Sequence, residues 1–233
     1  MVLAATVDHD DVSAGITAQV PYWVAVLTPE ERSFGTRRTD PRIDTVDSSV
    51  VSEISTQWAG SEHPSFATLL AVLAATVGAW QSDRCRSCTS GVLVDIAANP
   101  DIGTCSDGSA LFPVRLPTTG HTDTLVAEVR RRVAAAPNDG TDFAEAKYTF
   151  GSPALARKAG AQIAFLGTAG TSATPLSDAD EALHHSLTVR YDVSEIDGVT
   201  TVDAEFRWNS RIFTRSDVDD FERFWEKTLS AFA

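Results

Sequence analysis

The sequence predicts an α/β or α+β fold in which helices cover a mixed β-sheet. Segments with helical periodicity alternate along the chain with short runs of apolar, β-branched residues. The composition is that of a globular protein, with 43% hydrophobic and 22% charged residues. The 233 residues suffice for a substantial core, so a single domain is the expected arrangement.

The N-terminal part is predicted to hold a short helix, a linker and a strand. Residues 1–19 are polar and acidic. A helix is expected over residues 20–34, with these side chains on one side: Tyr22, Trp23, Val26 and Leu27. Residues 34–45 are rich in Arg, Asp, Thr and Pro, which is typical of a linker. Residues 46–54 then read as a strand, and the residues on its inner face are Val46, Val50 and Ile54.

The clearest helix is expected at residues 64–80. Its apolar residues recur every three or four positions on a single broad face. They are Phe66, Leu69, Leu70, Leu73, Val77 and Trp80. Pro64 suits the first turn of this helix, where its missing N–H costs nothing.

Two short strands and a second long helix follow. Residues 91–97 (GVLVDIA) form an apolar, β-branched run between turn residues, as expected of a buried strand. Residues 111–116 (LFPVRL) are expected to form another strand, which Pro113 restricts to an edge or a bulge. Residues 123–136 predict a helix whose inward residues are Leu125, Val126, Val129 and Val133.

A strand, a loop and a hairpin are predicted next. Residues 162–166 form a strand candidate, and residues 167–179 are rich in Gly, Ser, Thr and Pro, as loops are. Strands are expected at residues 187–193 and 200–208, joined by the hairpin turn Asp197-Gly198. In the second strand, apolar residues alternate with charged ones: Val202, Ala204, Phe206 and Trp208.

The last helix is the best delimited. Thr214 and Ser216 are both candidates for its N-cap, with Asp217 and Asp219 three residues after them. Its long apolar stripe predicts close packing on the rest of the domain: Val218, Phe221, Phe224, Trp225, Leu229 and Phe232.

The charge balance excludes some functions. The chain carries 19 Lys and Arg against 32 Asp and Glu, a net charge of −13, which disfavours nucleic acid and anionic membranes as partners. No apolar run is long enough to span a bilayer, and residues 1–5 are too short for a secretory signal. The odd number of cysteines argues against a disulfide framework and for a cytoplasmic location: Cys85, Cys88 and Cys105.

Three local patterns carry only weak chemical signals. Cys85 and Cys88 have redox or metal-binding spacing, but they follow a helix and lack further ligands nearby, so incidental thiols are the favoured interpretation. His184-His185 has no patterned acid or nucleophile around it and is best explained as a solvated strand edge. Residues 167–170 (GTAG) lack the lysine and spacing of a phosphate loop.

Several segments, read in order, have the form of known motifs. Residues 20–27 (VPYWVAVL) fit xYWxxxL, and residues 65–76 (SFATLLAVLAAT) fit NDVLLAALALA, with Ala67 where Asp is usual. The remaining matches are residues 91–96 (GVLVDI), residues 103–116 (GTCSDGSALFPVRL, against VGWFTSLYPVRL), residues 137–140 with Phe143 and Tyr148 (against PxxGxGYGxLRY), residues 161–167 (AQIAFLG, against xxFNYLG) and the final helix.

In their shared order and spacing, these segments resemble the C-terminal lobe of condensation and epimerization domains of nonribosomal peptide synthetases. The epimerization branch is the closer match, and the resemblance covers the chain from Val20 onward. It implies a chloramphenicol-acetyltransferase-like half-domain, with a mixed sheet covered by helices. Residues 1–36 would then be an N-terminal segment with a lead-in helix, and residues 37–233 the lobe.

The chain departs from this family at the groups that move protons. The family's motif H-H-x-x-x-D-G lies on the N-terminal lobe, and His184-His185 does not match it. The epimerase glutamate falls at Ala97 and its tyrosine at Phe165. Because methyl and phenyl groups transfer no protons, the catalytic residues stay unassigned, and we expect no catalysis by this chain alone.

The resemblance implies a role in shaping the tunnel in which carrier proteins present aminoacyl or peptidyl thioesters. Expected partners are the N-terminal lobe, other synthetase domains and a peptidyl carrier protein. No metal or cofactor is expected, since substrates arrive on the carrier's phosphopantetheine. The candidate tunnel or interface residues are Asn99, Cys105, Phe112, Tyr148 and Phe165. The three aromatic ones have ordinary core residues as an alternative interpretation, and a free lobe should expose an apolar inter-lobe face.

Two other functions stay open. The missing glutamate and tyrosine favour a non-catalytic interaction module, derived from such a lobe, that recruits another protein. A free-standing acyltransferase unrelated to this family is the third interpretation. Because fold resemblance alone does not determine function, the choice depends on the site.

Overall fold

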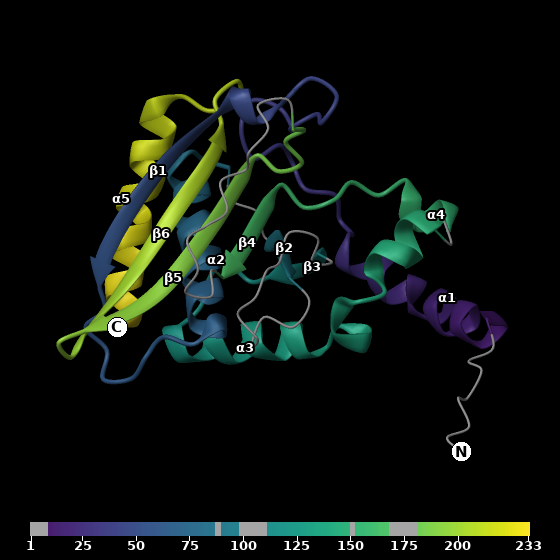
Figure 1. Cartoon of the computed structure of the whole chain (residues 1–233), viewed down its shortest axis with the longest axis horizontal. Helices are drawn as coiled ribbons and strands as arrows, with labels where there is room; N and C mark the ends of the chain where they lie inside the picture. The colour runs from purple at the N-terminus through teal and green to yellow at the C-terminus, as the bar shows by residue number, and fades with distance from the viewer. Residues whose placement is uncertain (1–8, 87–89, 98–110, 150–151, 168–180) are drawn as a thin grey trace, which may run out of the picture.

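The computed structural model describes residues 9–86, 90–97, 111–149, 152–167 and 181–233 (Figure 1). Its helices are α1 (His9–Val26), α2 (Phe66–Asp83), α3 (Thr122–Ala134), α4 (Pro153–Ala156) and α5 (Arg215–Phe232). Its strands are β1 (Ser49–Gln57), β2 (Val92–Ala97), β3 (Leu111–Leu116), β4 (Ile163–Gly167), β5 (Leu187–Ile196) and β6 (Val199–Asn209). Single helical turns lie at Val46–Ser48, Pro137–Gly140 and Glu145–Thr149.

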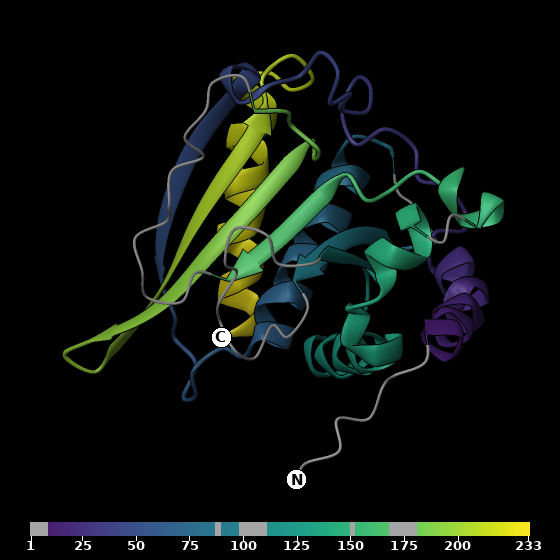
Figure 2. The ribbon, with the colours of Figure 1, turned by 45° about the vertical axis from the view of Figure 1, so that its right-hand side comes forward.

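The strands form one mixed sheet in the order β1-β6-β5-β4-β2-β3. The neighbours β2, β4 and β5 run parallel, whereas the remaining pairs are antiparallel. Helices α2 and α5 pack together and cover one face of the sheet (Figures 1 and 2). This confirms the predicted mixed sheet covered by helices. Pro113 lies on the edge strand β3, where its missing N–H breaks no ladder.

Helix α2 is the buried centre of the fold. It contacts α5, α3 and β2, and it is buried almost all round rather than on the single face that its periodicity predicts. Ser65 is its N-cap, and the Ser65 hydroxyl accepts a hydrogen bond from the Thr68 N–H at 3.1 Å. Pro64 therefore precedes the cap and is not in the first turn.

An aromatic cluster joins α2, α5 and the sheet. The Phe34 ring lies 4.8 Å from the Trp80 ring and stacks on Trp208 at 6.5 Å between centroids. Phe34 belongs to the stretch that reads as a linker, yet it is buried in this core. Residues 34–45 are therefore an anchored part of the domain, because a single buried aromatic fixes where they run.

The N-terminal helix is longer than predicted and begins earlier. It occupies His9–Val26 instead of residues 20–34, and Pro29 disfavours a helical conformation just after its end. Trp23 is fully buried and makes edge-to-face contacts with Phe143 at 5.0 Å and Phe112 at 6.1 Å. Through these contacts α1 shares the core of the domain.

The strand predicted at residues 46–54 is displaced. Val46 lies in a 3-10 turn, β1 begins at Ser49, and Val50 is exposed near the edge of the sheet. Ile54 remains on the helix-covered face, opposite Ala204 of β6. Of the expected apolar face, only Ile54 thus packs against the core, and it is partly buried.

The C-terminal predictions agree closely with the structure. The β5–β6 hairpin turns at Asp197 and Gly198, whose φ angles of 55° and 76° are those of a type I′ turn. Thr214 is the N-cap of α5 and forms a capping box with Asp217, so Ser216 is not the cap. The turns and short helix between residues 137 and 156 were not predicted, because they lack periodicity.

The face of the sheet away from α2 and α5 is polar over β1, β5 and β6. Its side chains include Glu53 and Ser55 on β1, and Asp203, Glu205 and Arg207 on β6. Large exposed apolar residues in the described part of the chain are few and scattered: Ile43, Val50, Val51, Tyr148, Ile196 and Val199. The expectation of an apolar inter-lobe face is therefore wrong for the residues that the structure describes.

Candidate functional site

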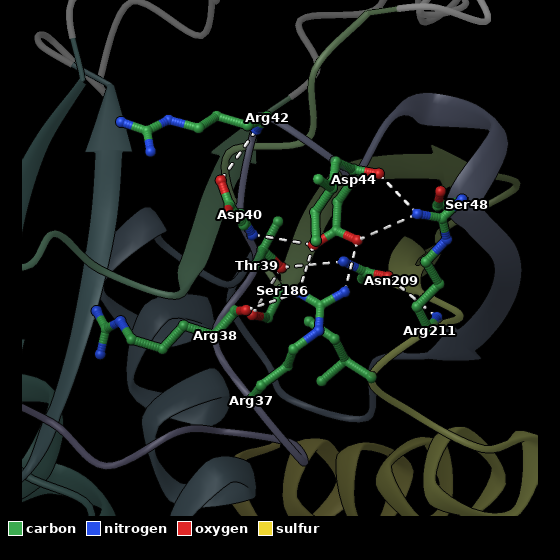
Figure 3. A network of polar contacts seen from close by, with 12 residues as sticks. Arg37, Arg38, Thr39, Asp40, Arg42, Asp44, Ser48, Ser186, Asn209 and Arg211 are labelled. Carbon is green, nitrogen blue, oxygen red and sulfur yellow. Dashed lines mark hydrogen bonds and ion pairs between the residues drawn. The ribbon is translucent and has the colours of Figure 1, made fainter.

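Two groups of polar side chains lie against the sheet, and they differ in how fully their members are paired. The first is centred on Asp44, which is fully buried (Figure 3). Its carboxylate accepts hydrogen bonds from the Arg37 guanidinium at 2.6 and 2.7 Å, and from the Asp40 backbone N–H at 2.9 Å. A buried carboxylate with three short donors is satisfied within the protein, so it has little capacity left for a ligand.

Neutral side chains extend the Asp44 group onto the sheet. The Thr39 hydroxyl lies 3.0 Å from the Ser186 hydroxyl and accepts a hydrogen bond from the Asn209 amide at 3.2 Å. Ser186 precedes β5 and Asn209 ends β6. The group therefore fixes the connection before β1 onto the ends of two central strands, and we assign it a structural role.

This group should make stability depend on pH in the acid range. The hydrogen bonds from Arg37 lower the pKa of Asp44 from 3.8 to about 2. A carboxyl whose folded pKa is depressed stabilises the protein above its unfolded pKa, and this stabilisation is lost as pH falls from about 4 toward 2. We expect a loss of about 2 kcal/mol in the free energy of unfolding across that range.

Urea denaturation at a series of pH values measures this loss. The variant Asp44→Asn should be less stable near neutral pH and should lose that part of the pH dependence. Asp219→Asn is the control, because the ion pair of Asp219 with Arg215 is exposed and contributes little. An unchanged acid dependence in Asp44→Asn would contradict the assignment.

The second group lies on the face of the sheet away from α2. Asp95 alternates along β2 with the buried residues Val94 and Ile96, so its side chain points to the opposite face. The His185 Nε2 atom lies 2.8 Å from the Asp95 Oδ2 atom. Both side chains are largely buried. The contact joins residues far apart in sequence and gives one ring nitrogen of His185 a fixed partner.

Lys147 belongs to this second group. It lies in the Glu145–Thr149 turn, and only 7% of its surface is exposed. Its Nζ atom lies 5.7 Å from the centre of the Phe143 ring and 5.4 Å from that of Tyr148. Burial lowers the pKa of Lys147, the nearby Asp95 charge acts in the opposite direction, and the Arg38 charge lowers it further.

A pocket lies at the beginning of β2 and β4, and its lining contains no residue of these two groups. Its volume is 470 Å³, and its lining includes residues 29–35, Gln162 and Ile163. Glu31 in this lining accepts a hydrogen bond from the Leu93 N–H at 2.5 Å, and burial raises the pKa of its carboxyl. The Gln162 side chain bonds the backbone of Phe34 and Arg32. These contacts hold the chain after α1 in place.

The candidate tunnel residues fall into three classes. Phe112 and Phe165 are buried in the core, where Phe165 stacks on Tyr191 at 4.7 Å. Tyr148 is 73% exposed, beside Lys147. Asn99 and Cys105 lie outside the described residues. Of the five, only Tyr148 is thus seen to present an accessible side chain in this lobe.

The position expected for the epimerase glutamate has an acidic neighbour. Ala97 is buried at the end of β2, and Asp95 lies two residues earlier on the same face of that strand. The family motif places the glutamate at position 97, so comparison with the motif passes over Asp95. The available sequence signal was a carboxylate inside a run that predicts a buried strand, because buried acidic residues are rare.

The two histidines of the pair have different environments. His184 is exposed, as a solvated edge predicts, whereas His185 is partly buried against Asp95. The interpretation that no acid accompanies the pair is therefore wrong for His185. Lys147 was missed as well, since nothing in its local sequence marks it as buried.

The remaining sequence candidates gain no support. Cys85 is exposed at the turn after α2, while Cys88 and residues 168–170 lie outside the described residues. Among the described residues, no three His, Cys, Asp or Glu side chains gather as metal ligands would. No described helix has the length and hydrophobicity needed to cross a membrane.

Comparisons with known proteins show the fold. No family model and no curated protein matches the sequence. Among solved structures, the epimerization domain of the third module of tyrocidine synthetase B matches with a TM-score of 0.64 and 13% identity, over 100% of this chain and 60% of that one. The X-domain in complex with OxyB from teicoplanin biosynthesis matches with a TM-score of 0.61 and 13% identity, over 93% and 52%.

Two further solved structures share this fold. The starter condensation domain of rhizomide synthetase matches with a TM-score of 0.62 and 10% identity, over 96% of this chain and 53% of that one. Chloramphenicol acetyltransferase matches with a TM-score of 0.51 and 13% identity, over 80% and 90%. The chain therefore has a chloramphenicol-acetyltransferase-like fold and spans between half and two thirds of the synthetase domains it matches.

Proposed function

We propose that this chain is the C-terminal lobe of a condensation/epimerization-type domain, which helps to shape the tunnel for carrier-bound aminoacyl or peptidyl thioesters. The observation that carries the proposal is the share of each chain that the superposition covers. The whole chain superposes on the epimerization domain of tyrocidine synthetase B but covers only 60% of it. A chain of this extent corresponds to one lobe of a two-lobed domain.

The sequence motifs support the same role for the lobe. The motif H-H-x-x-x-D-G is absent from this sequence, and Ala97 and Phe165 stand where the epimerase has its glutamate and tyrosine. Substrate turnover would therefore require residues of another lobe. The role of this lobe would then be to bind and orient the carrier-bound acyl group.

A titration against carrier protein tests this proposal. The chain would be mixed with a synthetase carrier protein in its apo form and with its phosphopantetheine arm bearing a stable aminoacyl amide. We expect the chain to bind the loaded form more tightly than the apo form, as measured by calorimetry. Equal binding of both forms, or of neither, would refute the proposed role.

The likeness to an X-domain favours a second candidate function. That domain has been solved in complex with OxyB, so a domain of this fold can hold another protein. The second candidate is a non-catalytic module that recruits a protein partner. Such a module would bind its partner without distinguishing loaded from unloaded carrier protein, which separates it from the first proposal in the same titration.

A further inference from the structure

The pocket at the beginning of β2 and β4 combines an apolar floor with a charged mouth. Its volume of 470 Å³ is in the range of small-molecule sites. Three of its lining residues are buried and apolar, and they form the floor: Phe34, Val92 and Ile163. Three others are exposed and charged, and they lie at the mouth: Glu30, Arg32 and Arg86. A ligand with an apolar part and a charged group would match both regions.

Hydrogen bonds fix the wall of this pocket. The buried Gln162 amide accepts a hydrogen bond from the Phe34 N–H at 2.9 Å and donates one to the Arg32 carbonyl at 2.8 Å. The Glu31 carboxylate accepts one from the Leu93 N–H at 2.5 Å. These bonds tie residues 31–34 to the beginning of both strands. A wall that is already ordered lowers the entropic cost of binding a ligand.

The charge around the pocket is positive, although the whole chain carries −13. The lining contains two arginines and two glutamates: Arg32, Arg86, Glu30 and Glu31. The charges of Arg115 and Arg38 also act on the Glu31 carboxyl, and both guanidinium groups donate to backbone carbonyl oxygens. Those carbonyl contacts hold the two arginines without cancelling their charge. Four arginines against two glutamates favour an anion over a cation as the ligand.

The two arginines at the mouth keep donors for a ligand. Among the described residues, the Arg86 guanidinium has one hydrogen bond, to the Gly35 carbonyl, and that bond is 3.5 Å long. The Arg32 side chain has no hydrogen bond or ion pair with the described residues. A guanidinium group carries five N–H donors in a planar fork. Its geometry matches a carboxylate or phosphate group through paired hydrogen bonds.

We propose that this pocket binds a small organic anion. The apolar part of the ligand lies on the buried floor, and its carboxylate or phosphate group accepts hydrogen bonds from Arg32 and Arg86. Glu31 limits the choice of ligand, because its carboxylate repels a second negative group placed near it. The pocket includes Val92, at the opposite end of β2 from Ala97. The site is therefore separate from the tunnel of the proposed function and goes beyond that function.

Three probes that share a phenyl ring test the role of the anionic group. Phenylacetate carries a carboxylate, phenyl phosphate carries a phosphate group, and phenylacetamide is an uncharged analogue of phenylacetate with nearly the same shape. The backbone amide signals of Phe34 and Leu93 report on the pocket in an NMR titration, because both N–H groups bond to its wall. We expect at least one anion to shift these signals in a saturable manner. Phenylacetamide should bind about tenfold more weakly than the preferred anion, as loss of a charged hydrogen bond predicts.

Variants of opposite sign test the charges. Arg86→Gln should weaken binding of the anion by about tenfold. Glu31→Gln keeps an oxygen for the Leu93 N–H but removes a negative charge, so it should tighten binding by about threefold. The matched control is Arg130→Gln, which removes the same charge from an exposed position on α3 and should leave the affinity unchanged. Circular dichroism shows whether each variant is folded.

Four results would overturn the inference. The first is the absence of saturable Phe34 and Leu93 shifts with both anions, and the second is equal binding of phenylacetamide and the preferred anion. The third is unchanged binding by a folded Arg86→Gln variant, and the fourth is weaker binding by folded Glu31→Gln. Should Arg86→Gln not fold, the comparison of charged and uncharged probes on the native sequence decides. The probes involve no carrier protein, so this site and the proposed function can fail independently.

Discussion

Replacing Phe221 by alanine should lower the free energy of unfolding by about 3–5 kcal/mol, as expected for removal of a fully buried aromatic side chain. Phe221 lies on α5 and is fully buried. Its ring is 5.0 Å from that of Trp208 and 5.8 Å from that of Phe206, both on the sheet, and 6.2 Å from that of Trp80 on α2. One side chain therefore joins both helices to the sheet.

The same helix supplies a matched control. Phe224 is only partly buried at the edge of the core, and its recorded ring contact is with the guanidinium of Arg223. Phe224→Ala should cost about 1 kcal/mol, because less apolar surface returns to water. Guanidinium denaturation of both variants measures the difference. Similar costs would show that Phe221 is not the aromatic centre that the ring contacts indicate.

The second large effect is expected from Gly140→Ala. Gly140 has a φ angle of 78°, in the left-handed region. A Cβ atom there would lie 2.1 Å from the Cδ1 atom of Phe112, which is itself buried against Trp23. The left-handed backbone costs a non-glycine residue about 1–2 kcal/mol, and overpacking adds about 1–3 kcal/mol. We expect a total loss of about 2–5 kcal/mol.

Gly198→Ala separates the two contributions. Gly198 has a φ angle of 76°, almost the same as Gly140, but a Cβ there would meet no atom within 4 Å. The loss of unfolding free energy in Gly198→Ala should therefore equal the cost of the left-handed backbone alone. The difference between the two variants in urea denaturation gives the steric cost at Phe112. If the variants are equally stable, Phe112 moves aside freely and the packing around Trp23 is looser than the ring contacts indicate.

The elements that the sequence predicts well are those with complete local signals. Helix α5 has a capping residue and an apolar stripe, and the β5–β6 hairpin has Asp197-Gly198 at its turn. Such signals act within a few residues, so no tertiary contact is needed to identify them. The mixed sheet covered by helices follows from the order of these elements.

The elements that were misplaced depend on distant contacts. The stretch around Phe34 reads as a linker by composition, but the Phe34 ring stacked on Trp208 and the hydrogen bond from Asn209 to Thr39 fix it to the sheet. Helix α2 shows one apolar face in sequence, yet the lobe buries it on nearly all sides. Small residues such as Ala71 and Ala74 satisfy this burial without adding to the periodic signal.

The candidate site was the hardest part to predict. Asp95 and His185 are brought together by the fold, and neither has a partner nearby in sequence. Comparison with family motifs directs attention to Ala97 and Phe165, where proton-transferring groups are missing. The sequence shows that Asp95 is acidic, but only the three-dimensional structure reveals that its carboxylate contacts His185 and that Lys147 is buried.

The pairing of β1 with β6 has a consequence for synthesis of the protein. Ser49 pairs with Asn209 and Gln57 with Thr201. The first strand along the chain therefore cannot pair until the last strand has been synthesised. While the nascent chain is still on the ribosome, β1 has no neighbour, and α2 lacks the cover that α5 later provides. Such non-local contacts slow folding. This interval before β6 and α5 emerge is therefore when an unpaired strand is most open to pairing with other chains.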